Sequence, residues 1–117
     1  MARADTLYIL FKGYVREDTV EFAVNECRNL LLREVRRYLV IDCCDIDGYS
    51  ADVRGPGVNL LKVTRGLGVL AGVCVAPTSA VRMMGAAAAF VSGVPIDFVA
   101  SRIECDAALA KRRREDG

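Results

Sequence analysis

The sequence contains no histidine, and this absence restricts the chemistry that the protein can perform. A serine or cysteine nucleophile ordinarily relies on a histidine base, so acyl-transfer catalysis of the common kind is disfavoured. Zinc sites commonly combine cysteine with histidine or use pairs of cysteines separated by two other residues, and neither pattern occurs here. We therefore expect a protein that is not an enzyme and that holds no metal and no cofactor.

Long apolar runs and a strong charge bias are also missing. The nearest candidate for a membrane helix, residues 83–91, is much shorter than the roughly 18 apolar residues required. The first residues have too short an apolar run before Lys12 to form a signal peptide. A net charge of +1 provides no global field for nucleic acid. We expect a cytoplasmic protein with no membrane span and no nucleic-acid partner.

What the sequence does contain is a regular alternation of two apolar patterns. Short apolar runs predict strands, near residues 7–12 (ended by Gly13), 38–42, 69–75 and 96–100. Helical spacing and capping residues predict helices, at about 16–36, 55–65 and 77–91, and after Ser101, where Glu104 completes a capping box. The order β-α-β-α-β-α-β-α predicts one α/β domain over residues 1–117. Its central, mainly parallel sheet should have about four or five strands covered by helices.

The five cysteines do not form a recognisable disulfide framework. Cys43 and Cys44 are adjacent at the end of a predicted strand, so their side chains should point to opposite faces and cannot share a metal ion. Cys27 and Cys105 fall in helical patterns and Cys74 in a strand pattern, as expected of small buried residues. We predict five free thiols.

An acidic segment, VIDCCDIDGYSAD, follows the second predicted strand. Its carboxylates superficially resemble a calcium loop, but the glutamate that ends such a loop is missing. In open α/β sheets, binding sites gather at the carboxyl ends of strands. We therefore predict a partner-docking surface in the loop here, formed by Asp45, Asp47, Tyr49, Ser50 and Asp52.

A run of small residues, Gly85 to Ala89, lies within the third predicted helix. Small residues allow close packing of this helix on the sheet. A sharper interpretation is a subunit contact with apolar anchors, which predicts a homodimer. The interface would comprise Met83, Met84, Ala87, Ala88 and Phe90.

Short motifs along nearly the whole chain resemble the STAS-like family, particularly the small stand-alone SpoIIAA-like bacterial domains. These motifs are the strand end Val40 to Asp42, the segment Gly48 to Ser50, the segment Val75 to Ser79, and Ala108-Leu109. The family includes anti-sigma-factor antagonists and is related to CRAL–TRIO lipid-exchange domains. The resemblance implies a regulatory or protein-interaction module.

Phosphorylation-controlled antagonists in that family carry an Asp-Ser pair at the start of a helix, and a partner kinase modifies the serine. The corresponding segment here, Tyr49 to Asp52, lacks the pair, so we predict that Ser50 is not constitutively phosphorylated. The leading hypothesis is docking of an unidentified protein partner through residues 45–52 and the following helix. An alternative is a small apolar ligand or lipid held between helices and sheet, which a deep apolar pocket would favour. A weaker third hypothesis is a small enzyme that uses a cysteine or an acid.

Overall fold

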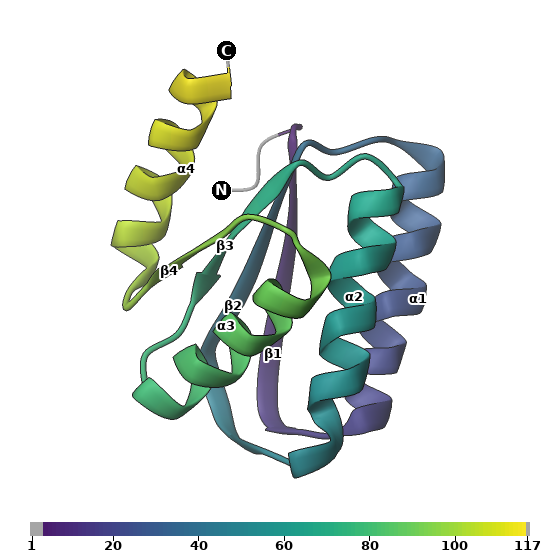
Figure 1. Ribbon diagram of the computed structural model, residues 1–117, viewed down its shortest axis with the longest axis vertical. Helices are drawn as coiled ribbons and strands as arrows, with labels where there is room; N and C mark the ends of the chain where they lie inside the picture. The colour runs from purple at the N-terminus through teal and green to yellow at the C-terminus, as the bar shows by residue number, and fades with distance from the viewer. Residues whose placement is uncertain (1–3, 117) are drawn as a thin grey trace.

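The computed structural model describes residues 4–116, and its elements follow the predicted order (Figure 1). The strands are β1 (Thr6–Val15), β2 (Tyr38–Tyr49), β3 (Ala71–Val75) and β4 (Ile96–Val99). The helices are α1 (Glu17–Arg33), the short 3-10 helix η1 (Ala51–Val53), α2 (Arg54–Gly66), α3 (Ser79–Ser92) and α4 (Arg102–Asp116). The predicted α/β class is confirmed.

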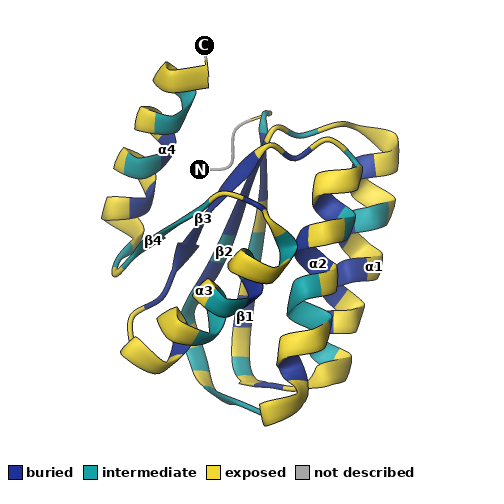
Figure 2. Ribbon diagram, viewed as in Figure 1, coloured by how far each residue is buried: buried dark blue, intermediate teal, exposed yellow. Residues whose placement is uncertain are grey.

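The described strands form a four-stranded sheet in the order β1-β2-β3-β4, and every neighbouring pair is parallel. Each crossover moves one strand further in the same direction. Right-handed crossovers therefore place α1, α2 and α3 on one face of the sheet. The chain then leaves β4 and α4 covers part of the opposite face, as Figure 1 shows. The result is three layers with β3 buried along its whole length (Figure 2).

The side chains of β2 alternate between the two faces of the sheet and pack against helices on both. Leu39 packs in a cluster with the buried residues of α1 and α2. The neighbouring Tyr38 and Val40 pack instead with Cys105 and Leu109 of α4. The period of two in a strand thus divides the apolar side chains between the two helical layers.

Two predictions about strand ends are wrong. Gly13 does not end the first strand, because β1 continues to Val15 with Gly13 at a positive φ of 70° beside a register irregularity. Only glycine adopts such a backbone without strain, so its presence allows the strand to continue. The segment after Asp42 is also strand rather than loop as far as Tyr49, which pairs with Val15.

Helix α4 covers only part of its face of the sheet, and the part of that face formed by β1 remains uncovered. Tyr8, Leu10 and Tyr14 point to this side and are 43%, 40% and 52% exposed. Within residues 4–116, no helix is both long enough and apolar enough to cross a membrane.

Candidate functional site

A buried carboxylate lies where β2 passes beneath the start of α4. The Asp42 side chain is fully buried and accepts three hydrogen bonds. Arg102 Nε donates to Asp42 Oδ2 at 2.6 Å, the Tyr8 hydroxyl donates to the same oxygen, and the Cys44 backbone N–H donates to Oδ1 at 3.0 Å. Three donors compensate for the lost hydration of the buried charge.

These contacts fix the protonation states of the cluster. Burial alone would raise the pKa of Asp42, but the hydrogen bonds from Arg102, Tyr8 and Cys44 outweigh it and lower that pKa to about 2. Burial, together with the neighbouring carboxylate, raises the pKa of Tyr8 to about 12. Asp42 is thus a permanent anion at neutral pH, and Tyr8 is a permanent donor. The arrangement is suited to holding α4 rather than to moving a proton.

Sequence reasoning missed Tyr8 and Arg102 as members of this cluster. One signal was present: Arg102 begins a helix, where a cation opposes the helix dipole, and such a placement indicates a nearby acid. Arg102 Nη2 also donates to Asp45 Oδ2 at 3.1 Å. Asp45, predicted as a docking residue, is therefore paired within the chain.

The other predicted docking residues lie around the junction of β2, η1 and α2. Asp47 and Asp52 are exposed, whereas Tyr49 and Ser50 are half-buried. The Ser50 hydroxyl donates to Asp52 Oδ1. The Tyr49 hydroxyl donates to the Ala80 carbonyl at 3.3 Å, which links β2 to the start of α3. Ser50 and Asp52 thus form one small polar group, while Tyr49 is turned toward α3.

Negative charge accumulates beside Asp52. The carboxylates of Asp52 and Glu21 raise the pKa of Glu17 in the first turn of α1. In residues 4–116 none of these three carboxylates forms an ion pair. We call Glu17, Glu21 and Asp52 the acidic surface; among the described residues no ion pair offsets the repulsion that Glu17 experiences from the other two carboxylates.

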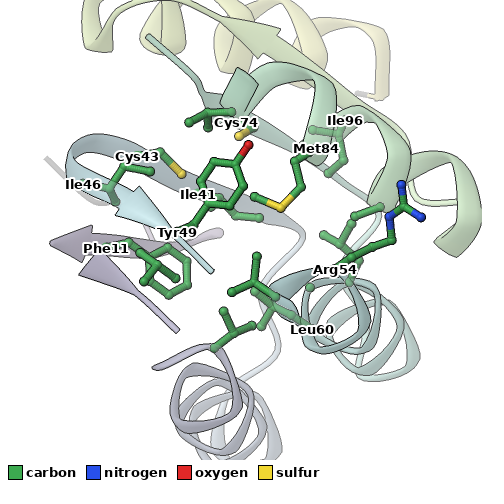
Figure 3. A pocket seen from close by; sticks show the side chains of 18 of the residues that line it. Phe11, Ile41, Cys43, Ile46, Tyr49, Arg54, Leu60, Cys74, Met84 and Ile96 are labelled. Atoms are coloured by element: carbon green, nitrogen blue, oxygen red, sulfur yellow. The ribbon is translucent and has the colours of Figure 1, made fainter. Parts of the chain in front are cut away.

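An apolar cavity of about 110 Å³, partly open to solvent, lies between the sheet, α2 and α3 (Figure 3). Its wall includes Phe11, Ile41, Cys43, Ile46, Tyr49, Val53, Leu60, Cys74, Met84 and Phe98. Among the described residues that line it, Arg54 is the only charged one, and Figure 3 shows its guanidinium turned away from the centre. Gly85 of α3 also contributes, because a Cβ there would lie only 2.8 Å from Phe98 Cε1. Close approach of α3 to β4 therefore shapes one wall.

Two of the five free cysteines face this cavity. Interaction between these two thiols lowers the pKa of Cys43, and the same interaction together with burial raises the pKa of Cys74. Burial raises the pKa of Cys27 and of Cys105 to about 11. Cys44 points to the opposite face, where burial and the Asp42 carboxylate raise its pKa. Among residues 4–116, no three His, Cys, Asp or Glu side chains are arranged to hold a metal ion.

The predicted dimer residues divide between two faces of α3. Met84 lines the cavity and Ala88 is only 7% exposed, so both point inward. Met83 and Phe90 are 72% and 89% exposed, and Ala87 lies between them on the helix. An interface on this helix would therefore use Met83, Ala87 and Phe90.

The parallel sheet with three helices on one face and one on the other defines a STAS-like fold, as the sequence motifs predict. The chain is similar to the anti-sigma factor antagonist SpoIIAA in its unphosphorylated form, with a TM-score of 0.66. The alignment covers 97% of this chain and 94% of that chain at 12% sequence identity, a likeness that shows the fold alone. No family model matches the chain, and no curated protein matches its sequence.

Proposed function

We propose that this chain is a non-enzymatic regulatory module in the cytoplasm that docks a basic protein partner. The docking region comprises the acidic surface together with Asp47 and Ser50. The observation that carries the proposal is the gathering of Glu17, Glu21 and Asp52, which are exposed and form no ion pair within the described residues. A partner's lysine or arginine side chains would pair with these carboxylates, and complementary charge favours both encounter and specificity.

The similarity to SpoIIAA supports a role of this kind, because that protein is described as an antagonist of another protein. The Asp42 cluster supports it differently. Arg102 already neutralises Asp42 and Asp45, so of the four aspartates in residues 42–52 the two left for a partner are Asp47 and Asp52. Asp42 and Asp45 thus form contacts within the chain, whereas the acidic surface is available to a partner.

Charge reversal tests the proposal. The variant Glu17→Lys/Asp52→Lys should lose partner proteins that the unaltered chain retains when each is incubated with extract from the native host. The control variant Glu26→Lys/Glu115→Lys changes net charge equally at exposed positions outside the acidic surface. Retention of the same proteins by both variants, with the fold intact, contradicts docking through the acidic surface.

A second candidate function is binding of a small apolar ligand, and the cavity between the sheet, α2 and α3 is the specific observation that favours it. Gly57 lines the cavity, and a Cβ there meets no atom within 4 Å, so a side chain can start at this position and Gly57→Leu should reduce the space. Gly55 is equally free of neighbours but does not line the cavity, which makes Gly55→Leu the matched control. Chemical-shift changes on adding 1-octanol should disappear in Gly57→Leu and persist in Gly55→Leu.

We also propose a homodimer in which α3 packs against α3 of a second copy. Met83 and Phe90 are large apolar side chains that remain mostly exposed in the single chain. Ala87 between them would allow two helices to approach closely. Light scattering of variants at Ala87 and Phe90 tests this contact.

A further inference from the structure

We propose that Cys43 is a covalent modification site for an apolar electrophile that enters the cavity. The inference rests on the second candidate function, binding of a small apolar ligand. It adds a chemical class of ligand, an α,β-unsaturated ketone with a short hydrocarbon chain, and it names the atom that the ligand would reach, Cys43 Sγ.

Position separates Cys43 from the other thiols. Cys43 is half-buried on β2 and lines the cavity, so its sulfur can be reached from within it (Figure 3). Cys44 is half-buried as well, but alternation along the strand directs it toward α4. Cys27 and Cys105 are 3% exposed and lie outside the cavity. An apolar molecule in the cavity therefore meets Cys43 and its neighbour Cys74.

The contact between these two thiols favours Cys43 as the nucleophile. Cys43 is half-buried whereas Cys74 is only 5% exposed, so a molecule in the cavity reaches the Cys43 sulfur more readily. The thiolate is the reactive form, and interaction with the Cys74 thiol favours it on Cys43. Burial and the nearby Asp42 carboxylate act in the opposite direction, yet the pKa of Cys43 is still lowered. The same interaction, together with burial, raises the pKa of Cys74, which keeps that sulfur protonated.

The reaction balances without an oxidant or a second substrate. Cys43 loses its thiol proton to water, and Sγ forms a bond to the β-carbon of the unsaturated ketone. The electron pair of the carbon–carbon double bond moves to the α-carbon, which takes a proton from water. The product is a thioether with the carbonyl group restored, and nothing leaves.

The cavity wall selects for apolar reagents. Its side chains are hydrocarbon, aromatic and sulfur groups apart from Arg54, whose charge is directed outward. A short hydrocarbon chain gains free energy on entering such a space, while a polar amide loses hydration without finding partners. The enone 1-octen-3-one should therefore react faster at Cys43 than the short enone 3-buten-2-one, which has the same reactive group, and no such preference should occur at Cys44.

The test measures alkylation rates at neutral pH by intact-mass and fragment spectra, using 1-octen-3-one on the full chain. The matched variants are Cys44→Ser, which retains the cavity thiol, and Cys43→Ser, which retains its neighbour. We expect the first adduct on Cys43 and at least about tenfold faster single labelling of Cys44→Ser than of Cys43→Ser. First labelling at Cys44, Cys74 or any other residue overturns the proposal.

A second pair of variants tests the role of Cys74. Cys74→Ala removes the neighbouring thiol and should slow alkylation of Cys43 by about threefold to tenfold, the size expected for loss of one polar contact. Cys74→Ser keeps a donor and should restore most of the rate. Equal rates in both variants contradict the activation by Cys74.

A saturated analogue, octan-3-one, separates failure of this inference from failure of ligand binding. If octan-3-one shifts the resonances of cavity residues and slows labelling of Cys43, both ligand binding and the covalent modification of Cys43 are supported. If it shifts those resonances but Cys43 reacts no faster than Cys44, the covalent proposal is overturned while ligand binding stands. If it causes no shifts and no protection, the ligand-binding function fails, and this inference fails with it.

Discussion

Arg102 Nε lies 2.6 Å from Asp42 Oδ2, so the first residue of α4 is joined to a carboxylate that is wholly buried beside the sheet. The hydrocarbon contribution to this docking is small, because Cys105 and Leu109 are the buried residues in the described part of α4. Further along the helix, Arg113 pairs with Asp5 at 2.8 Å. The helix is thus positioned by ion pairs near both ends and by two apolar contacts between them.

Removing the Arg102 side chain should destabilise the fold. In Arg102→Ala the buried Asp42 loses a charged donor while Tyr8 and the Cys44 N–H remain, and we expect a loss of about 1.5–3 kcal/mol in the free energy of unfolding. Arg112→Ala on the same helix breaks a pair with the half-exposed Asp97 and should cost about 0–1 kcal/mol. Urea denaturation measures both, and equal losses would contradict a special role for Arg102.

Stability should fall at acid pH because of Asp42. Its folded-state pKa of about 2 lies below the ordinary 3.8, so its contribution is complete above about pH 4 and is lost as the pH falls toward 2. The size of this contribution is about 2 kcal/mol. Asp42→Asn should be less stable at neutral pH but should lose less stability between pH 4 and pH 2. An acid dependence identical to that of the unaltered chain would show that other carboxylates cause it.

Replacing Phe90 with Glu should yield monomers. The side chain is 89% exposed in the single chain, so the charge would disrupt a contact between two copies while leaving the fold intact. Light scattering should give twice the 12.7 kDa chain mass for the unaltered protein and the single mass for Phe90→Glu and Ala87→Glu. Ile103→Glu, at an equally exposed apolar position on α4, should remain dimeric. A monomeric unaltered protein, or a dimeric Phe90→Glu, excludes this interface.

Ser50 should carry no constitutive phosphate in the native host. Its hydroxyl donates to Asp52, so phosphorylation would replace that donor by up to about two negative charges next to a carboxylate. Attraction from a helix amino terminus is worth only about 0.3–1 kcal/mol at an exposed site, and η1 has only three residues. Intact-mass spectrometry of protein from its native host checks this, and a substantial population phosphorylated at Ser50 would restore a phosphorylation switch.

The parts of the fold that were predicted correctly depend mostly on local sequence patterns, namely apolar runs and capping residues. The apolar runs that became β2 and β3 and the cap at Ser101 depend on neighbouring residues, and the structure contains both features. The Glu104 carboxylate accepts from the Ala100 N–H, one residue before the position that a capping box requires. The extension of β2 to Tyr49 was missed because aspartate and glycine have low strand propensity. It depends on pairing with β1, which is distant in sequence.

The site was less predictable for the same reason. The acids near Ser50 were identified as a group, but the sequence does not show that Arg102, 60 residues from Asp42, would neutralise two of them. Nor does it show that Cys43 would meet Cys74, since their contact arises from the lateral order of β2 and β3. The residues of the predicted α3 interface were identified from composition alone. The sequence did not show which side of the helix faces the sheet, and the structure places Met84 and Ala88 on that side.

Site-specific photo-crosslinking in the native host tests the central claim, docking through the acidic surface, most directly. A photoreactive residue replaces Ala51, which is exposed beside Asp52, and in a separate control it replaces Ala110, which is exposed on α4. We predict one discrete crosslinked protein from position 51, none from position 110, and loss of that product when Glu17→Lys/Asp52→Lys is added. Crosslinks of equal yield at both positions, or a product at position 51 that survives charge reversal, would contradict docking through the acidic surface.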